Sequence, residues 1–392
     1  MTLRWFISKT VRHATAMRKH VRNILNAQRD ILSPQAVQAV GAALDEFGTA
    51  IKSDTEKSAL LKQMEKLEDV ANKWLKPYPN AGYRENVEVF LVALAVAMGI
   101  RTFFVQPFKI PTGSMQPTLF GVTSTNLVDQ PGVQIPTGLE RIREWFAGVS
   151  YVDVIAKADG VLERIADPVG IRVIDFWQTI YIGGVAHMMF FPPDYGGPPI
   201  GTLQARSGLR IGEPFRKGDQ VVRLKTQSGD HLFVDRLTYN FRKPKRGEII
   251  VFATKGIDEE RRNDPQGRWQ IPDDQFYIKR QVALSGERAQ IGQDHHLIIN
   301  GQRLDTGTPG FENVYKLTHD DPQNDYNGHL PIQLFADGKE FQVRSNHFMV
   351  MGDNTGNSLD SRFFADVDAD YIIGKSSFVY WPITSRFGLG YR

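Results

Sequence analysis

The sequence predicts a mainly β protein whose antiparallel sheets follow one apolar helix and a helical N-terminal region. Three observations carry this prediction. Apolar residues recur at helical spacing before residue 77, an uncharged run extends from Val89 to Ile100, and short strand-like segments fill the chain after Pro107. With 392 residues, 41% of them hydrophobic and 23% charged, the chain has the composition of a folded globular protein and the length for two or three domains.

The N-terminal region, residues 1–84, is expected to be helical. In "ALLKQMEKLEDVANKWL", Ala59 to Leu75, apolar residues lie three and four positions apart with charges between them, and two prolines follow in "KPYPNAGYR". The stretch from Met1 to Arg29 contains seven Lys or Arg residues and no acidic residue. The simpler interpretation of this basic stretch is a solvated helix face, and contact with anionic lipid is the alternative.

A transmembrane helix is predicted over residues 85–106. The nineteen residues from Val87 to Val105 contain only Glu88 and Arg101 as charges, both near the ends, where long side chains reach the headgroups. A helix of that length spans roughly 28 Å, close to the thickness of a hydrocarbon core. A buried helix of a globular protein is the alternative interpretation.

The flanking charges predict the orientation of this helix. Three basic residues precede it closely, whereas Lys109 alone follows. Because basic residues concentrate on the cytoplasmic side of a span, we expect the N-terminal region in the cytoplasm and residues 107–392, the β domain, outside it. The three preceding residues are Lys73, Lys76 and Arg84.

The chain after Pro107 is expected to form antiparallel sheets, because seven short β-branched or aromatic segments end at Gly, Asp, Asn or Pro without regular helices between them. Residues 121–216 interrupt this pattern and are expected to form a large insertion or second strand-rich lobe. Within them, "TIYIGGVAHMMFFPP" indicates a buried strand pair rather than a membrane-leaning surface, and "GLERIREWFAGV" indicates a helix. The seven segments are "QVVRLKT", "DHLFVDRLTY", "EIIVFAT", "QFYIKRQVAL", "HHLIING", "HFMVMGD" and "SSFVYW".

Ser114 is the candidate nucleophile. It stands on the small-residue loop of "FKIPTGSMQPTL", directly after the apolar helix and two prolines, a setting that a serine in a helix cap or turn does not need. The chain has no cysteine, which excludes thiol nucleophiles and zinc–thiolate sites. None of the nine histidines stands in a recognisable catalytic-triad context.

Lys279 is the candidate base for this serine, because it lies in the apolar strand segment "FYIKRQVAL" and Arg280 points to the opposite face. An ordinary lysine, with a pKa near 10.4, is neutral in about one molecule in 2,500 at pH 7. Half neutrality requires a pKa lower by roughly three units, about 4.6 kcal/mol, which full burial among apolar groups can supply. A lysine whose amine reaches solvent from the strand is the alternative.

The loop "MGDNTGNSLDSRFFADV", Met351 to Val367, places acidic, amide and basic side chains after a strand. A divalent-metal loop is one interpretation, but the terminal acidic ligand of a calcium loop is missing and Arg362 is a poor neighbour for a cation. A hydrogen-bonded scaffold is favoured, in which Asp360 pairs with Arg362 and Ser358 orients another polar group.

These segments, in this order behind an apolar helix, resemble the type I signal peptidases, the membrane-anchored Ser/Lys endopeptidases of peptidase family S26 that remove leader peptides. "QPFKIPTGSMQPTL" is similar to the serine box of that family, "YIKRQVALSGE" to its lysine box and "GDNTGNSLDSR" to its final box; "SGDHLFVDRLTYNFRKPKRGEIIVF" resembles the strand pair between the first two. The resemblance implies a signal-peptidase-like antiparallel β domain. The lysine box usually continues with Gly-Asp, where Ser285-Gly286-Glu287 stands here, and the long insertion and N-terminal region are further differences.

The resemblance also implies a role for each matched residue. Ser114 is the nucleophile, Lys279 is the general base, and the Ser358 hydroxyl holds the lysine amine in place. The N–H of Ser114 and the hydroxyl of Thr112 form the oxyanion hole. Two further sets follow from the same match: the structural ion pair of Asp360 and Arg362, and shallow pockets for small side chains lined by Ile110, Met115, Tyr277 and Ile278.

The implied reaction removes N-terminal signal peptides from exported preproteins, cutting after small residues of the Ala-X-Ala type through an acyl-enzyme. It requires no metal and no cofactor. Signal peptides and membrane lipid are the expected partners, and a net charge of +3 is too small to indicate nucleic acid. The expected location is the bacterial cytoplasmic membrane, with one span and the catalytic domain on the outer face.

Two other functions fit parts of the pattern. A self-cleaving repressor-type Ser/Lys peptidase is soluble and carries a DNA-binding region, whereas this chain has an apolar segment and no recognisable helix-turn-helix. A non-enzymatic membrane scaffold would bind exported chains without cutting them, but such a protein does not need both Ser114 and Lys279.

Overall fold

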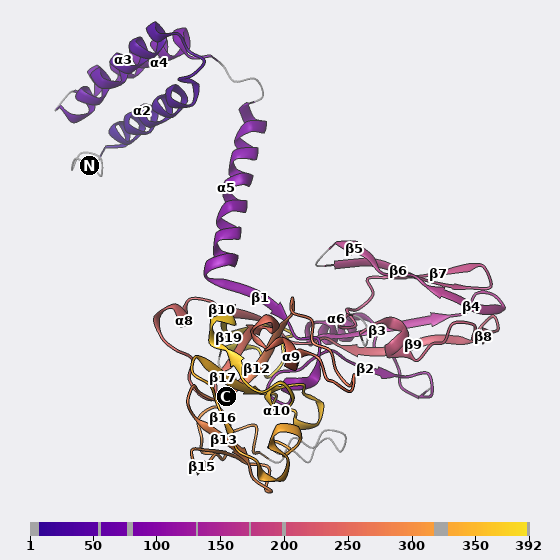
Figure 1. Cartoon of the computed structure of the whole chain (residues 1–392). Coiled ribbons are helices and arrows are strands. Elements are labelled where there is room, and N and C mark those ends of the chain that lie inside the picture. The colour runs from indigo at the N-terminus through magenta and orange to yellow at the C-terminus, as the bar shows by residue number, and fades with distance from the viewer. Residues whose placement is uncertain are drawn as a thin grey trace. The chain divides into compact units, whose positions relative to one another are not determined.

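The computed structural model describes residues 8–53, 56–76, 81–130, 132–171, 174–197, 201–316 and 328–389 (Figure 1). The chain divides into two compact units, Met1–Ala95 and Val96–Arg392. The described part of the first unit is helical, and the second consists mainly of antiparallel sheets, which confirms the fold class expected from the sequence.

Three helices pack together in the first unit. Ser8 and Ser33 act as N-caps of the first two, since each side chain accepts a hydrogen bond from a backbone N–H three residues later. The apolar stripes of the three helices meet in one core, in which Phe47 and Leu67 are almost fully buried. The helices are α2 (Lys9–Gln28), α3 (Pro34–Lys52) and α4 (Lys57–Trp74).

The next helix, α5 (Ala81–Phe103), is apolar and exposed. Its segment Glu85–Phe103 has a mean hydropathy of 1.6 and is 0% buried, and among the described residues it is the one helical segment long and apolar enough to cross a membrane. A core helix of a globular protein would be covered by its neighbours, so the alternative of a buried globular helix is not supported.

The largest sheet of the second unit has eight strands, and their pairings are antiparallel. Their order is β1-β10-β19-β11-β12-β17-β18, with β20 beside β19. The sheet curls: Phe108 of β1 and Phe276 of β12 pack edge to face with ring centroids 5.6 Å apart, although three strands separate them in the sheet. The strands are β1 (Val105–Lys109), β10 (His231–Asp235), β11 (Ile249–Ala253), β12 (Phe276–Ala283), β17 (His347–Met351), β18 (Val367–Asp368), β19 (Ile372–Trp381) and β20 (Gly388–Leu389).

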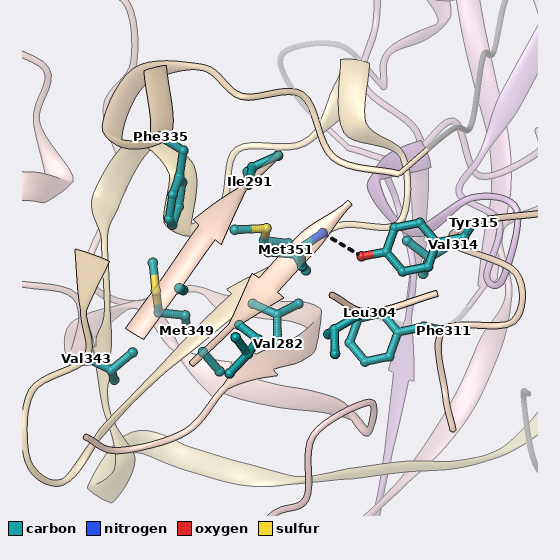
Figure 2. Close-up of a cluster of buried hydrophobic side chains, with 14 residues drawn as sticks. Val282, Ile291, Leu304, Phe311, Val314, Tyr315, Phe335, Val343, Met349 and Met351 are labelled. Atoms are coloured by element: carbon teal, nitrogen blue, oxygen red, sulfur yellow. Dashed lines mark hydrogen bonds between the residues drawn. The ribbon is translucent and has the colours of Figure 1, made fainter. Parts of the chain in front are cut away.

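A second, smaller sheet with the order β15-β14-β13-β16 builds a lobe with its own core (Figure 2). Met349 and Met351 of β17 reach into this core, where they meet buried side chains such as Phe335. The Leu297 N–H donates a hydrogen bond of 3.1 Å to the Tyr315 hydroxyl, so the one phenol of this core is satisfied. The strands are β13 (Arg288–Ile291), β14 (Leu297–Ile299), β15 (Gln302–Arg303) and β16 (Phe341–Gln342).

A third group of strands fills most of the chain between β1 and β10. It forms a sheet of order β2-β9-β3 and a sheet of order β5-β6-β4-β8 with β7 beside β6, and the two share a core of their own. β6 and β7 form a hairpin through Gly183 and Gly184, both with positive φ, which confirms the predicted strand pair. The pair is buried on one face only, because Met188 and Phe190 are 48% and 70% exposed. The strands are β2 (Thr123–Asn126), β3 (Val149–Ile155), β4 (Gly160–Ile165), β5 (Val169–Ile171), β6 (Ile174–Ile182), β7 (Val185–Phe190), β8 (Pro214–Phe215) and β9 (Gln220–Gln227).

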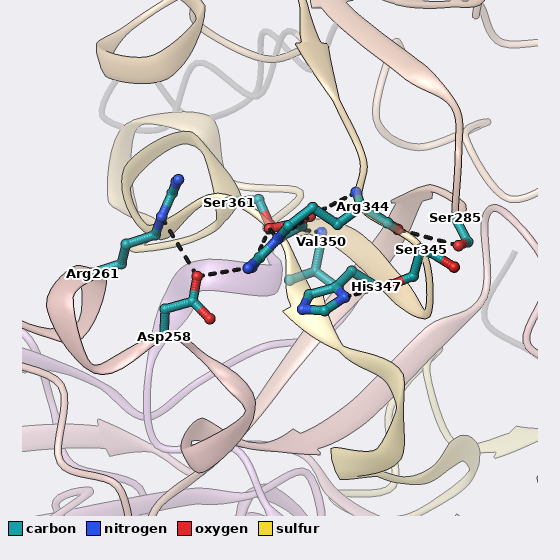
Figure 3. A network of polar contacts seen from close by, with 9 residues as sticks. Asp258, Arg261, Ser285, Arg344, Ser345, His347, Val350 and Ser361 are labelled. Carbon is teal, nitrogen blue, oxygen red and sulfur yellow. Dashed lines mark hydrogen bonds and ion pairs between the residues drawn. The ribbon is translucent and has the colours of Figure 1, made fainter.

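Short helices and polar contacts connect these sheets. Figure 3 shows Arg344 bound to Asp258, at 2.8 Å, and the Val350 N–H donating to the Ser361 hydroxyl at 2.9 Å. Because Val350 lies in β17 and Ser361 begins α10, this last bond closes the loop between them. The helices of the second unit are α6 (Gly138–Phe146), α7 (Leu203–Ser207), α8 (Thr238–Phe241), α9 (Glu259–Arg262) and α10 (Ser361–Phe364).

Candidate active site

Ser114 lies in a single 3₁₀ turn, η1 (Gly113–Met115), shortly after β1 ends. The loop after β17 holds this turn: Asn354 donates its backbone N–H to the Ser114 carbonyl at 3.1 Å and its Nδ2 to the Gly113 carbonyl at 3.1 Å. Gly352 lies against the same carbonyl, because a Cβ there would come within 2.4 Å of the Ser114 oxygen. The backbone that carries the serine is therefore fixed by a loop more than 230 residues later in the chain.

Lys279 reaches Ser114 from the middle of β12. Its Nζ donates a hydrogen bond of 2.7 Å to the Ser114 Oγ, and both residues are 5% exposed. The strand is paired with β11 on one side and, from Arg280 onward, with β17 on the other, so the position of the amine is set by the sheet. The alternative interpretation of the sequence, in which the lysine amine reaches solvent, is not supported, because Lys279 is buried.

Burial lowers the pKa of Lys279 to about 8. The negative charge of Asp360 opposes this effect, the positive charge of Arg362 adds to it, and Asp353 opposes it again. Desolvation is the largest of these effects and sets the direction of the change in pKa. At pH 7 about one amine in ten is then neutral, instead of about one in 2,500 for an ordinary lysine.

The expected pocket residues lie around this contact at different depths. Ile110 and Met115 are 1% and 0% exposed, inside the hydrophobic core beneath the curled sheet. Tyr277 and Ile278 are half-buried, and the Lys279 amine lies 5.5 Å from the centre of the Tyr277 ring. A substrate would thus meet the second pair of side chains more directly than the first, and the pocket-lining role of all four stays a prediction.

Asp360 and Arg362 form an ion pair that is fully buried, with both nitrogen–oxygen contacts at 2.9 Å. Asp360 also accepts the Gly352 N–H at 3.0 Å, and Arg362 donates to the Thr355 hydroxyl at 2.7 Å. Burial raises the pKa of Asp360, but the charge and hydrogen bonds of Arg362 lower it by more, so the carboxyl has a lower pKa than usual. These contacts fit the hydrogen-bonded scaffold that the sequence favours.

Ser358 and Thr112, the two remaining expected residues, border the contact. Ser358 packs against Gly352, and its buried Oγ forms no hydrogen bond to Lys279 within the described chain. Thr112 precedes η1, is exposed, and does not use its hydroxyl to cap that turn. The orienting role of Ser358 and the oxyanion role of Thr112 stay predictions.

A second buried ion pair lies on the other face of β12. The Arg280 guanidinium binds Asp353 through contacts of 2.8 and 2.5 Å, and the Thr118 hydroxyl donates to the same carboxylate at 2.5 Å. The pair joins the strand of the lysine, the loop of Asn354 and the loop of the serine. The sequence placed Arg280 on the face opposite Lys279 but did not predict Asp353 as its ion-pair partner. A buried arginine requires a buried acid, and this requirement could have pointed to Asp353 in the final box.

Three of the described histidines lie against backbone groups, and burial keeps a fourth neutral. The His187 ring is buried and accepts the Lys157 N–H, and His296 and His347 lie within hydrogen-bonding distance of backbone carbonyls. Burial, helped by the charge of Lys109, lowers the pKa of His231 to about 4, so this ring is neutral near pH 7. The partner of the Ser114 hydroxyl is Lys279.

Comparison with known families shows which proteins this chain is similar to. The sequence model described as "Signal peptidase, peptidase S26" matches residues 83–128 and 213–381, more than half of the chain. The chain belongs to this family. The two matched stretches contain β1, the Ser114 turn and most of the curled sheet, whereas residues 129–212 and the three-helix unit lie outside them.

Individual relatives in the family are similar over the same part. Signal peptidase I of Leptolyngbya laminosa is 30% identical over 162 residues, 41% of this chain and 64% of the relative. Probable signal peptidase I-2 of Synechocystis is 27% identical over 42% of this chain and 60% of its own length. The match thus spans less than two thirds of these two relatives.

A further relative and a solved structure are also similar to this chain. Signal peptidase IB of Staphylococcus aureus is 28% identical over 45% of this chain and 82% of the relative. A crystal structure of a signal peptidase I from Enterococcus faecalis aligns with 35% of this chain and 98% of its own, at 22% identity and a TM-score of 0.24.

The buried amine makes a prediction about stability. Its folded pKa of about 8 lies below the unfolded value near 10.4, so the folded protein is penalised wherever the amine is charged, and stability recovers as the pH rises from about 8 to 10.5. Lys279→Met keeps the length and removes the charge. We expect the variant to be more stable than wild type by about 2 kcal/mol at pH 6.5, with a smaller difference at pH 10.

Chemical unfolding of the detergent-solubilised chain at both pH values measures this difference. Lys339→Met, at an exposed position, is the control and should change stability little at either pH. An equal stability of wild type and Lys279→Met at pH 6.5 would contradict the buried charge.

The second ion pair makes another prediction. Arg280→Met leaves the Asp353 carboxylate buried without its partner, and we expect a loss of about 3–5 kcal/mol in the free energy of unfolding. Arg303→Met breaks the half-exposed pair with Asp294 and should cost less than about 1 kcal/mol. Equal losses in the two variants would show that burial of the first pair has no energetic consequence.

Proposed function

We propose that this chain is a membrane-bound serine endopeptidase that removes N-terminal signal peptides from exported preproteins, with Ser114 and Lys279 as its catalytic dyad. The observation that carries the proposal is the 2.7 Å hydrogen bond between two buried groups, the Lys279 Nζ and the Ser114 Oγ. The pKa of about 8 at the amine supports the role of base. Membership in the family supports the substrate class, since its relatives are named signal peptidases.

The reaction proceeds by acyl transfer. Neutral Lys279 accepts the proton of the Ser114 hydroxyl while the oxygen attacks the scissile carbonyl carbon. The same amine then gives that proton to the departing amine of the mature protein, which leaves the signal peptide as an ester on Ser114. A water molecule, deprotonated by Lys279, attacks the ester and releases the signal peptide.

The negative oxygen of the tetrahedral intermediate needs hydrogen-bond donors. The Ser114 N–H and the Thr112 hydroxyl are the proposed pair, and the exposed Thr112 hydroxyl is not occupied in capping η1. Ser358 is the proposed positioning residue for the amine. It lies against Gly352, which itself touches the Ser114 carbonyl and donates to Asp360.

The curl of the sheet supports an extended substrate between two unpaired strand edges. β1 is the edge strand of the sheet, and the first half of β12, before Arg280, pairs with no described strand on its β17 side. Phe108 and Phe276 mark where these two edges approach each other. A peptide that adds as a strand there would place alternate side chains toward the core. The filled core leaves little depth, which fits cleavage after small residues.

The exposed apolar helix α5 supports a membrane location. The backbone passes directly from α5 through Phe104 into β1, and fewer than ten residues separate Phe104 from Ser114. An extended chain of that length reaches at most roughly 30 Å, so the serine stays close to the lipid surface where a cleavage site leaves the membrane. The flanking charges support a cytoplasmic N-terminus at the bacterial cytoplasmic membrane.

A cleavage assay tests the dyad. Full-length protein in detergent is incubated with a peptide that spans a signal-peptide cleavage site ending in Ala-X-Ala. We expect Ser114→Ala and Lys279→Ala to lose at least about 1,000-fold in kcat. Lys279→Arg should be equally inactive, because a guanidinium keeps its proton at working pH. Cleavage by either variant at the wild-type rate would refute the assignment.

The pH dependence tests the base. Since only the neutral amine accepts the serine proton, the rate should rise about tenfold per pH unit below pH 8 and level off above it. The rate of acyl-enzyme formation between pH 6 and 10 measures this profile. A rate that is flat from pH 6 to pH 8 would contradict Lys279 as the group that must lose its proton.

A further inference from the structure

The helix α6 is amphipathic with its apolar side facing outward. It lies within residues 129–212, which the family match leaves out. None of its nine residues is buried, and all four of its large apolar side chains are exposed. We call these four residues the α6 face; they are Leu139, Ile142, Trp145 and Phe146, with exposures of 85%, 54%, 54% and 46%.

Two charged side chains of α6 contact Tyr151 of β3. Arg141 donates to the Tyr151 carbonyl at 3.2 Å, and Glu144 is half-buried, whereas the other eight residues of the helix are exposed. Burial and a hydrogen bond to Glu144 raise the pKa of the Tyr151 hydroxyl to about 12. A helix that only covered a soluble core would present the reverse arrangement.

The α6 face is fixed to the curled sheet. The Trp145 ring lies 4.9 Å from that of Trp381, and the Ile383 N–H donates to the Phe146 carbonyl at 2.9 Å. The apolar surface continues on the segment after β19, where Ile383, with Phe387 and Leu389, is 47% to 77% exposed. The exposed face is thus part of a larger apolar surface whose position is set by the sheet.

The sheet register places this surface close to the end of α5. Trp381 pairs with His231, which in turn pairs with Lys109 at the far end of β1. Phe104, at the near end, accepts the Arg236 N–H at 3.0 Å. Six steps from Lys109 back to Phe103, the last residue of α5, give about 20 Å and two strand spacings about 10 Å, so Trp381 and the end of α5 are roughly 22 Å apart.

We propose that the α6 face lies in the headgroup and acyl-chain boundary of the same bilayer that α5 spans, as a second lipid contact of the catalytic unit. Trp and Phe beside charged residues are the composition of an interfacial helix, and the nearby anchor keeps the face at the bilayer surface. The inference deepens the proposed function and rests on its membrane location. If α5 and the α6 face both contact lipid, β1 and the Ser114 turn are held along the lipid surface.

Spin labels in the full-length chain test the contact directly. The chain has no native cysteine, so Leu139→Cys and Ile142→Cys can each carry one nitroxide in lipid nanodiscs of phosphatidylethanolamine and phosphatidylglycerol. We expect both labels to be relaxed more by oxygen than by a water-soluble nickel chelate. Glu140→Cys, on the other side of α6, and the exposed Lys339→Cys are aqueous controls, and Leu91→Cys within α5 is the lipid control.

Two results would overturn the proposal. If the nickel chelate relaxed the labels at the α6 face as strongly as the label at Lys339→Cys, the α6 face would lie in water and not in lipid. Dipolar coupling between labels of different molecules, with protection from both reagents, would assign the face to a second copy of the chain.

Cleavage provides a second test. We expect Leu139→Glu with Ile142→Glu to slow the cleavage of a membrane-inserted preprotein in proteoliposomes about tenfold, and that of a short peptide in detergent less than twofold. Glu140→Gln with Arg143→Gln, on the same helix, should change neither rate. Wild-type cleavage of the preprotein by the Glu variant would overturn the inference. If the wild-type protein cut neither substrate, the proposed peptidase would fail, whereas the label result would still decide the lipid contact.

Discussion

An amine that is to be neutral near pH 7 must be surrounded by protein in place of water, and the rest of this structure depends on that constraint. Lys279 meets it from the middle of a strand, between a filled core and the Ser114 turn. Two acids and two arginines lie buried nearby, but each acid is paired with an arginine. These pairs fix the geometry of the site, and burial remains the largest influence on the pKa of the amine.

The same curled sheet positions both the proposed dyad and the proposed place for a substrate. Because the curl brings β1 back toward β12, the serine that follows β1 meets the lysine on β12, and two unpaired edges face each other beside them. The loop after β17 then locks the serine turn through Asn354 and Gly352. A flat sheet with the same strand order would keep these groups three strands apart.

The segments outside the family match are attached without disturbing that sheet. The three-helix unit has a core of its own, and the strands of residues 129–212 share a core with β9, which lies inside the match but outside the curled sheet. The second of these segments carries the outward-facing helix α6, whose contact with Trp381 ties it to the catalytic sheet. The part inside the family match thus contains Ser114 and Lys279, and the part outside it contains the exposed apolar side of α6.

The sequence by itself determined the features that depend on neighbours along the chain. Helical spacing gave α4, the uncharged run gave α5, and alternation placed Arg280 and Lys279 on opposite faces, because each pattern repeats within a few residues. The matched boxes pointed to Ser114 and Lys279 as a pair. Only the tertiary structure decided the 2.7 Å contact between them, the pairing of Arg280 with Asp353, the burial of Ile110 and Met115, and the outward side of α6. Desolvation and long-range contacts arise from packing among distant segments, and no local pattern contains that information.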